Sequence, residues 1–413
     1  MPKQRSLLLI SYGYPPIGGA ASERSLMLSR YLSELGWKIY VYCAAADAPH
    51  LFTDERAVEL IPPAVSVERM ALPRWYQAIW STRILRAGAN FALLTLDPTH
   101  FWSSACLQRI RQEQHERPDV ILTTSPPHSV HTIGAGLKQY WGTPWVMDLR
   151  DTWIENNTAR WYTPIHQYVS NWHYRRAILT ASKIVANTPE MAQLIASKFP
   201  QRSADVVTIR NGYDERLFQW ASPKRPSDST EHTRVILYSG GTYEGWVTGV
   251  LEQLSRALRS RQATDGRYIQ LYAIGDLVTT EPENPVGPFG LGHQSIMDVP
   301  DYLLGADALL LCMLPQEAGS SRVLLKAYGY ARAGKPILYL GPRNATYDYL
   351  VQRASVHQFE LSEIELAAQW LLSHHFKSMP PEPPAQDVIQ DSFYARAKRL
   401  SEILENEILE NSG

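Results

Sequence analysis

Short apolar runs alternate with amphipathic helical patterns along most of this chain. The first run covers 7–10, and after it Leu28, Leu32 and Leu35 fall on one helical face. Strand-length runs separated by helix-length segments are typical of parallel sheets with helices on both faces, so the alternation predicts an α/β fold. The other candidate strands are 38–43, 120–124, 145–148, 183–187, 206–210, 234–239, 268–274, 308–312 and 336–340, and the main candidate helices are 22–35, 166–181, 246–259, 322–333, 345–353 and 391 onward.

The alternation breaks at 219–233, which is polar and contains proline, and again at PPEPP, 380–384. A chain of 413 residues also exceeds one ordinary domain. Two doubly wound domains are therefore predicted, with a ligand in a cleft between the carboxyl ends of their sheets. The predicted boundaries are a Rossmann-like domain over 1–215, a linker over 216–233, a second Rossmann-like domain over 234–385 and a helix over 386–413 that returns to the first domain.

Composition excludes several classes of protein. The formal net charge of −1 gives no basic excess for binding nucleic acid. Cys43, Cys106 and Cys312 lie far apart, which predicts no disulfide, no metal site and a reducing, cytoplasmic compartment. The first apolar run is too short for a signal peptide, and no run approaches the length of a membrane-spanning helix. The sequence holds no GxGxxG after a strand, GxxxxGKS/T, HExxH, CxxC or GxSxG, so dehydrogenases, P-loop enzymes, zinc enzymes and serine hydrolases have no support.

The stretch SYGYPPIGGAASERS, 11–25, joins the first strand to the first helix. Pro15 and Pro16 stiffen the exit from the strand, and Gly18 and Gly19 keep side chains away from the backbone. The N–H groups at the start of a helix attract negative charge, so an anionic ligand is one interpretation of this loop. A tight turn with tolerated glycines is the other.

Several motifs occur in a recognisable order. They are PPIGG before a helix, DVILTTSPP, PWVMDLRDTW, KIVANTPEM, TIRNGYD and KAYGYARAGKPIL. In this order and at these spacings they resemble a retaining glycosyltransferase of the GT-B fold. The resemblance is to the family 4 group that builds bacterial polysaccharides and lipid-linked glycans, in the branch with a D-x-R-D-x-W segment. It covers the chain from Leu7 to about residue 345.

The resemblance implies two Rossmann-like domains facing each other across a cleft. It further implies transfer of a sugar from a nucleotide-sugar donor to an acceptor hydroxyl, with retention and with neither metal nor cofactor. The N-terminal domain would hold a glycan, lipid-linked or small-molecule acceptor, and the C-terminal domain the nucleotide. Gly18 and Gly19 would then leave room for the donor phosphates or sugar. Biosynthesis of a surface glycan or another glycoside is the expected role.

Carried over residue by residue, the resemblance places charged groups at the end of the strand 145–148. Many relatives have a histidine there, whereas this chain has Asp148, Arg150 and Asp151, which we expect to reach the cleft as catalytic residues. An internal Arg150–Asp151 ion pair is a compatible alternative. The acceptor side is assigned His128, His131 and Asn187, although helix capping or packing explains the two histidines equally well.

The donor side departs from the family pattern. Relatives carry Gly-Arg and then Lys after the strand 234–239, but here Gly240, Gly241 and Thr242 follow it, so phosphate binding by backbone N–H groups is predicted. The family's paired glutamates fall on Ser321 and Gly329. The expected replacements are Glu317 as the catalytic carboxylate and Ser320, Ser321, Arg322 and Lys326 as donor contacts, with Arg322 and Lys326 at i and i+4 of one helix; a solvated basic face is the alternative.

Residues 69–96 contain four arginines, two tryptophans and no acidic residue. Such a segment fits an interfacial helix on an anionic membrane. The protein would then lie at the inner face of that membrane. A helix packed on the first sheet with snorkelling arginines fits as well. For the whole chain, two further functions stay open: a catalytically degenerate GT-B protein that binds a glycan or a partner, and a nucleotide-sugar epimerase, for which no acid/base pair is found.

Overall fold

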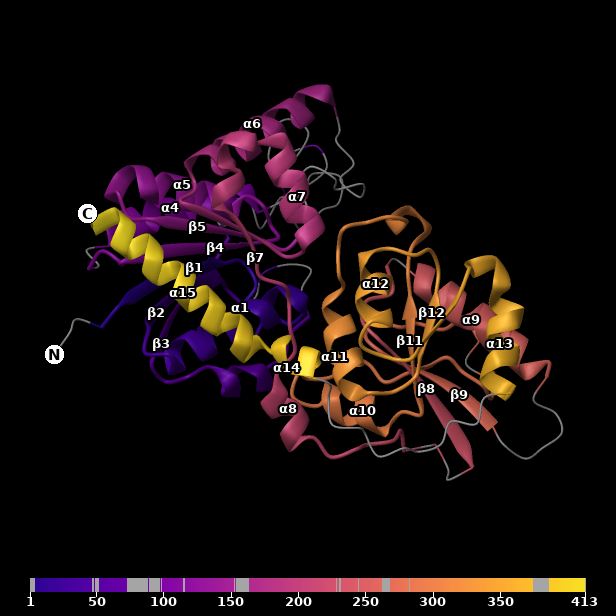
Figure 1. Cartoon of the computed structure of the whole chain (residues 1–413). Coiled ribbons are helices and arrows are strands. Elements are labelled where there is room, and N and C mark those ends of the chain that lie inside the picture. The colour runs from indigo at the N-terminus through magenta and orange to yellow at the C-terminus, as the bar shows by residue number, and fades with distance from the viewer. Residues whose placement is uncertain are drawn as a thin grey trace. The chain divides into compact units, whose positions relative to one another are not determined.

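The chain folds into two compact units, each built on one parallel sheet (Figure 1). Unit 1 takes Met1–Asn211 and Phe393–Gly413, and unit 2 takes Gly212–Ser392. This computed structural model describes residues 4–46, 48, 52–72, 88, 97, 99–113, 116–151, 153, 163–227, 229, 232–243, 245–261, 268–281, 283–373 and 386–412.

The sheet of unit 1 has seven parallel strands in the order β3-β2-β1-β4-β5-β6-β7. The reversal of order between β1 and β4 places the carboxyl ends of these two strands at a switch point, the usual place for a ligand in open α/β sheets. The bounds are β1 Ser6–Ser11, β2 Lys38–Ala44, β3 Val65–Met70, β4 Val120–Ser125, β5 Trp145–Leu149, β6 Lys183–Ala186 and β7 Val206–Thr208.

Helices cover both faces of this sheet. Buried side chains of α4, α5, α6 and α7 form one apolar cluster with Ile121 and Trp145 of the sheet. On the opposite face α15 packs along α1 (Figure 1), and just after α1 the Trp37 Nε1 donates to Ser401 Oγ of α15 over 2.8 Å. The bounds are α1 Ala20–Glu34, α4 His100–Gln112, α5 Val130–Trp141, α6 Pro164–Thr180, α7 Pro189–Lys198 and α15 Phe393–Ser412, with 3₁₀ turns at Arg56–Leu60 and Pro200–Asp205.

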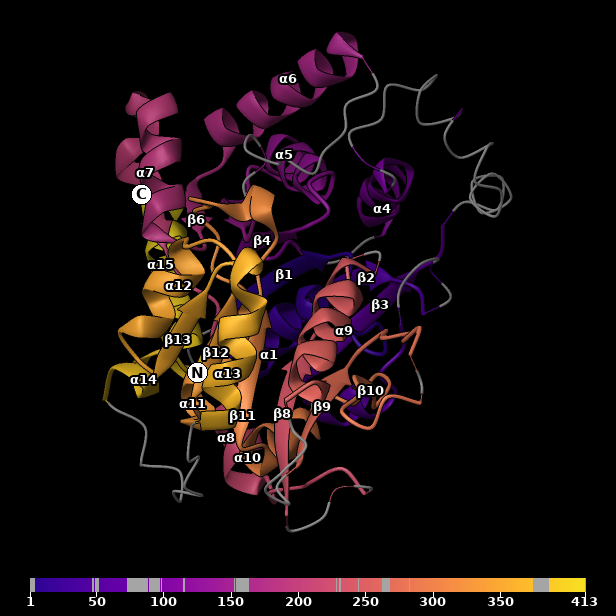
Figure 2. The same ribbon diagram turned by 90° about the vertical axis from the view of Figure 1, so that its right-hand side faces the viewer.

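Unit 2 has six parallel strands in the order β10-β9-β8-β11-β12-β13. Helices α9 and α13 lie together on one face of the sheet, in front of it in Figure 2, and α10, α11 and α12 pack on the other. The strands are β8 Thr233–Ser239, β9 Tyr268–Ile274, β10 Phe289–Gly290, β11 Ala308–Cys312, β12 Ile337–Leu340 and β13 Val356–Phe359. The helices are α8 Glu215–Trp220, α9 Trp246–Arg259, α10 Val299–Gly305, α11 Leu325–Ala333, α12 Ala345–Val351, α13 Ile364–Ser373 and α14 Gln386–Gln390, with 3₁₀ turns at Pro315–Glu317 and Leu361–Glu363.

The predicted α/β class with parallel sheets is confirmed, and several details differ from expectation. The strands β3, β10 and β13 were not predicted; all three are short, partly exposed edge or near-edge strands without a continuous apolar run. The helix predicted over 322–333 begins at Leu325, so Arg322 precedes it. Residues 216–233, predicted as a linker, lie in unit 2, where Arg225 pairs with Asp307 over 3.1 Å.

Among the described residues, none of the helices has both the length and the apolar character that crossing a bilayer requires. Arg74, Arg83 and Arg86, on which the predicted membrane contact of 69–96 depends, lie outside the described residues.

Candidate functional site

The glycine-rich loop after β1 is closed by packing rather than open to a ligand. The Gly18 N–H donates to the Phe52 carbonyl over 2.8 Å, and a Cβ at Gly18 would overlap the Phe52 ring. The Asp54 N–H donates to the Pro16 carbonyl over 2.6 Å and fastens the loop a second time. Gly19 is exposed and adopts φ 99° at the N-cap of α1. The expectation that Gly18 faces phosphates is therefore corrected: its backbone is engaged and only Gly19 stands at the surface.

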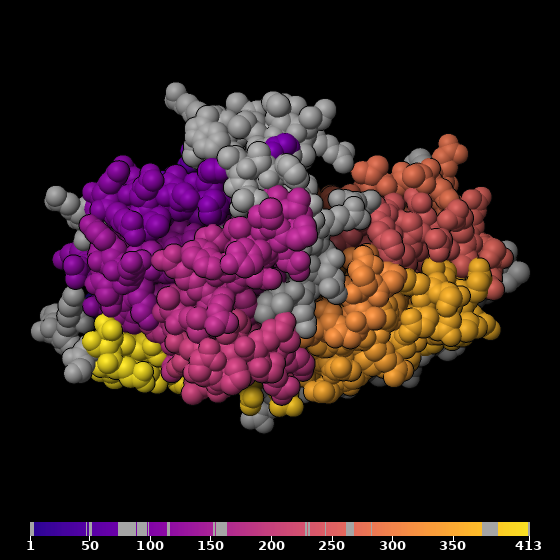
Figure 3. Space-filling view, turned by 90° about the horizontal axis from the view of Figure 1, so that it is seen from above, coloured from indigo at the N-terminus to yellow at the C-terminus, as the bar shows by residue number. Residues whose placement is uncertain are grey.

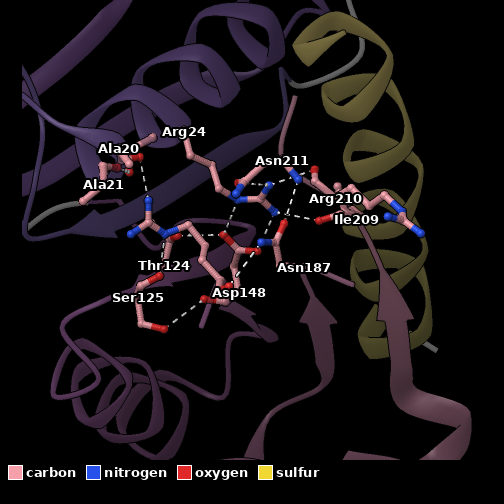
Figure 4. Close-up of polar contacts among 12 residues, drawn as sticks. Ala20, Ala21, Arg24, Thr124, Ser125, Asp148, Asn187, Ile209, Arg210 and Asn211 are labelled. Atoms are coloured by element: carbon pink, nitrogen blue, oxygen red, sulfur yellow. Dashed lines mark hydrogen bonds and ion pairs between the residues drawn. The ribbon is translucent and has the colours of Figure 1, made fainter. Parts of the chain in front are cut away.

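A buried ion pair lies just behind this loop (Figure 4). Arg24, on the first turns of α1, donates from Nε and Nη2 to the two carboxylate oxygens of Asp148 over 2.9 and 2.7 Å. The Thr124 hydroxyl donates to the same carboxylate over 2.7 Å. Both members of the pair are fully buried. Such a two-pronged contact is the strongest geometry that arginine and a carboxylate can form.

Arg24 also holds the segment that leads out of unit 1. Its Nη1 donates to the Arg210 carbonyl over 3.0 Å and to Asn211 Oδ1 over 3.2 Å, and its Nη2 donates to the Ile209 carbonyl over 3.1 Å. Asn187 supports the same segment, since its Oδ1 accepts the Asn211 N–H over 2.7 Å. The guanidinium therefore joins α1, the end of β5 and the last residues before unit 2.

The charged groups at the end of β5 differ from the predicted catalytic set. Asp148 is enclosed by Arg24 and Thr124, so the prediction that it reaches a cleft is wrong. Arg150 is buried too: its Nε donates to the Ser125 carbonyl over 2.6 Å and its Nη1 to the Ala20 carbonyl over 2.7 Å. Burial lowers the pKa of Arg150, although the neighbouring Asp151 raises it. These two residues fix the loops around the switch point, and Asp151, which is less buried, stays the predicted catalytic residue here.

Asn187 is likewise engaged inside the protein. Its Nδ2 donates to the Arg150 carbonyl over 3.2 Å, in addition to the contact with Asn211. Both ends of the amide are thus used, which corrects the expectation that it contacts the acceptor. Arg24 was not predicted at all. A signal was present, because Arg24 falls four residues before Leu28 on the apolar face of its helix, and a charge on such a face needs a buried partner.

Two histidines follow β4 and pack against an aromatic side chain. The His128 ring stacks on Trp153 with centroids 4.8 Å apart and planes 8° apart. His131 Nδ1 lies 2.8 Å from the Thr123 hydroxyl in the core. Burial lowers the pKa of His128 to about 4 and that of His131 well below its usual value, so both rings are neutral at pH 7. Within the described residues, His128 Nδ1 and His131 Nε2 have no hydrogen-bond partner, and no cluster of three metal-ligating side chains occurs.

In unit 2 the loop from β8 to α9 uses two of its backbone N–H groups inside the protein. The Gly240 N–H donates to the Ile274 carbonyl and the Thr242 N–H to Asp276 Oδ1, each over 2.9 Å. Gly240 adopts φ 134°, which glycine tolerates best. Phosphate binding by these backbone groups alone is therefore corrected: Gly241 is the one residue of the three whose N–H has no partner among those described.

The side chain of Lys326, near the start of α11, reaches this loop from the interior of unit 2. Its ammonium is completely buried, has no hydrogen-bond partner among the described residues and lies 4.0 Å from the centre of the Tyr238 ring. A Cβ at Gly240 would overlap the Lys326 Nζ, so the amine lies directly against the loop. Burial, and secondarily Arg322, lower the pKa of Lys326 to about 7. The alternative of a solvated basic face is thus wrong for Lys326.

The segment before α11 folds back on itself. Arg322 Nη2 donates to Glu317 Oε1 over 2.7 Å, and the Glu317 carbonyl accepts the Ser320 N–H over 3.0 Å. The Ser320 carbonyl accepts the first N–H of α12, from Ala345, over 3.0 Å. Glu317 and Arg322 therefore form a partly exposed pair. The position of the second family glutamate, Gly329, points toward Leu303 and Phe218 of the core.

The structure thus brings the predicted residues together in four groups, two in each unit. Asp148, Arg150 and Asn187 form the network around Arg24, and His128 and His131 form the stack with Trp153. In unit 2, Gly240 lies against Lys326, while Glu317 pairs with Arg322.

Comparison with known proteins agrees with this architecture. Residues 19–212 match the family model described as Glycosyl transferase 4-like domain. No curated protein matches. The match begins at the last glycine of the loop, covers the Arg24 network and most of unit 1, and supports the resemblance to family 4 glycosyltransferases.

Solved GT-B glycosyltransferases share the fold of the whole chain. HepE of Anabaena, solved with UDP and glucose, is 14% identical, covers 98% of this chain and 100% of its own, and superposes with a TM-score of 0.63. Sucrose-phosphate synthase of Thermosynechococcus elongatus is 13% identical over 97% of this chain and 98% of its own, with a TM-score of 0.65. WaaG, a glycosyltransferase involved in lipopolysaccharide biosynthesis, is 13% identical over 96% of this chain and 99% of its own, with a TM-score of 0.59. At such identities the likeness establishes the GT-B fold.

Proposed function

We propose that this protein is a glycosyltransferase that moves a sugar from a nucleotide-sugar donor to an acceptor hydroxyl. The GT-B fold of the chain and the match of its N-terminal part to a glycosyltransferase 4-like domain support this proposal. The transfer retains the anomeric configuration and needs no metal. The observation that carries the proposal is the buried ammonium of Lys326, which has no hydrogen-bond partner among the described residues and lies against the loop after β8.

A buried cation without a counter-charge costs stability, and a protein keeps one where a ligand supplies the missing charge. A nucleoside diphosphate is a ligand of the right sign. It also leaves as an anion in the reaction, so a positive charge beside it stabilises the transition state. Lys326, the buried Thr242 and the N–H of Gly241, which has no partner among the described residues, would hold the diphosphate, and Arg322 would add a second charge. Lys326 takes the place of the cations that are missing after β8.

On the acceptor side we assign Asp151 and His128. A neutral imidazole at pH 7 can accept a hydrogen bond from an acceptor hydroxyl, and His128 Nδ1 has no partner among the described residues. Asp151 lies near enough to raise the pKa of His128. A glycan, lipid-linked or small-molecule hydroxyl is the acceptor class, in the biosynthesis of a surface glycan or another glycoside in the cytoplasm.

Thermal melting with EDTA and a panel of UDP-, GDP-, dTDP-, ADP- and CMP-sugars tests the donor. UDP-glucose is the first candidate, because HepE is solved with it. One nucleotide sugar should raise the melting temperature of the parent and of Lys335→Ala, a matched loss of a lysine outside the loop, but not of Lys326→Ala. Absence of any shift in the parent would overturn the proposal. The anomeric coupling constant of the product then decides retention.

A second candidate is a binding protein without transferase activity. It is favoured by Gly329, which puts no carboxylate at the ribose position, and by Glu317, whose carboxylate is paired with Arg322. Binding of a nucleotide sugar with no hydrolysis or transfer to any acceptor would favour this candidate.

A further inference from the structure

Helix α6 presents large apolar side chains to solvent. Ile165, Tyr168, Trp172 and Leu179 are 59%, 71%, 48% and 37% exposed. No other described helix carries more than two exposed large apolar residues. Exposed apolar side chains are therefore concentrated on α6, whereas on most surfaces they occur singly.

These side chains form one stripe. At 100° per residue, positions 165, 168, 172 and 179 fall within about 60° of one another, and Arg175 and Arg176 flank them. The opposite face of the helix, with Tyr174, Ala177 and Ile178, is buried in the core of unit 1. The outward face is therefore the unusual one, because a helix on a globular domain normally turns polar residues to water.

The charge on this face has a single sign. Helix α6 contains two arginines and neither aspartate nor glutamate. Arg176 lies 5.6 Å from the centre of the Trp172 ring and donates to Gln139 of α5 over 3.3 Å, which ties the stripe to its neighbour. On α5, Tyr140 is 56% exposed and has Arg111 of α4 5.1 Å from the centre of its ring. We call the set Ile165, Tyr168, Trp172, Leu179, Tyr140, Arg111, Arg175 and Arg176 the aromatic–arginine face; Figure 3 looks down on the side of unit 1 that carries α4, α5 and α6.

We propose that the aromatic–arginine face docks on a lipid bilayer that contains anionic phospholipids. Tyrosine and tryptophan favour the boundary between headgroups and acyl chains, since one part of each ring is apolar and another forms hydrogen bonds. Arginines at the edge of such a stripe reach the phosphates while their methylenes stay in the apolar layer. A second protein copy is the rival occupant, but the excess of positive charge is complementary to an anionic surface and repels an identical face.

This surface differs from the segment 69–96, in which Arg74, Arg83 and Arg86 lie outside the described residues, and it does not depend on the donor chemistry. Its test therefore needs no nucleotide sugar. The full chain is sedimented with sucrose-loaded vesicles of phosphatidylcholine alone and of phosphatidylcholine with phosphatidylglycerol. We expect binding to the anionic vesicles, reduced by salt. Arg175→Ala with Arg176→Ala should weaken it about 20-fold, and Tyr168→Ser with Trp172→Ser roughly 10-fold or more.

Two controls match these changes away from the face. Trp220→Ser removes a tryptophan that is more exposed than Trp172, and Arg256→Ala with Arg259→Ala removes two exposed arginines from α9. Both should bind as the parent does, and circular dichroism checks that every variant is folded. The proposal is overturned if the parent does not bind anionic vesicles or if the α6 variants bind unchanged. Loss confined to Arg74→Ala, Arg83→Ala and Arg86→Ala would assign docking to 69–96 instead, and a dimer seen by light scattering that only the α6 variants lose would assign the face to a second copy.

Discussion

Two buried cations occupy comparable places in the two units, and they differ in their partners. Arg24 of unit 1 lies under the loop after β1 and forms five hydrogen bonds, two of them to Asp148. Lys326 of unit 2 lies under the loop after β8, and within the described residues its Nζ forms none. A cation whose donors are all used inside the protein stabilises the fold, whereas one kept without a counter-charge is available to a ligand.

The largest effect is expected for Arg24→Met. The change removes the charged partner of the buried Asp148 carboxylate and the guanidinium donor of three main-chain or amide oxygens, which should lower the free energy of unfolding by about 3–5 kcal/mol. Urea unfolding followed by tryptophan fluorescence measures it. Arg24→Met with Asp148→Leu should recover part of the loss, because both charges then leave together. An unchanged midpoint in Arg24→Met would mean that the pair contributes nothing.

Lys326→Met should act in the opposite direction. Because burial lowers the pKa of Lys326 to about 7, the folded protein resists protonation of this amine while the unfolded chain accepts it. The resulting destabilisation of the folded protein is complete below pH 7 and disappears above the ordinary lysine pKa near 10.5. We expect the variant to be more stable than the parent by on the order of 2 kcal/mol at pH 6 and no different at pH 11. It should also lose the nucleotide-dependent melting shift; destabilisation at pH 6 would contradict the assignment.

Diphosphate binding should depend on pH through the same amine. The ligand prefers protonated Lys326, so its affinity should fall about tenfold for each pH unit above 7. Calorimetry with UDP in buffers of different ionisation enthalpy should detect proton uptake on binding at pH 8. Lys326→Met serves as the control and should take up none. Equal proton uptake by parent and variant would place the titrating group elsewhere.

The smallest effect on stability is expected for Arg322→Ala. Its pair with Glu317 is partly exposed, so solvent screens it and the free energy of unfolding should change by less than about 1 kcal/mol. The affinity for UDP should nevertheless fall severalfold if Arg322 adds charge to the diphosphate site. Arg259→Ala, an exposed arginine of the same unit, is the matched control. A stability loss as large as that of Arg24→Met would remove the distinction between structural and ligand-binding cations.

Much of the fold follows from the sequence. The strands 268–274 and 308–312 and the helix 246–259 lie where apolar periodicity predicts them, because each is an internal element with a continuous buried run or a clear stripe. The missed β13 is half-buried throughout, and half-buried edge strands lack the apolar signal. Segments such as 216–233 look like linkers because polar composition does not reveal which main-chain groups they bond.

The site follows less well, for a physical reason. Sequence placed Asp148, Lys326 and Gly240 near ligands because of residue type and family position, but it could not say which charges meet each other inside the fold. Asp148 pairs with Arg24, which is 124 residues away in the chain, whereas Lys326 has no hydrogen-bond partner among the described residues. Pairing over such separations is decided by the register of the sheet, which local patterns do not contain.

The position of helix α15 makes the folding of unit 1 depend on the order in which the chain is synthesised. Unit 1 contains the N-terminal residues, yet α15, which packs on α1 through Tyr31 and Tyr394, emerges from the ribosome after all of unit 2. The first unit to be translated is therefore the last to be completed. Until Phe393–Ser412 arrives, the outer face of α1 stays bare, and during that interval it offers a binding site to chaperones and a point of attack to proteases.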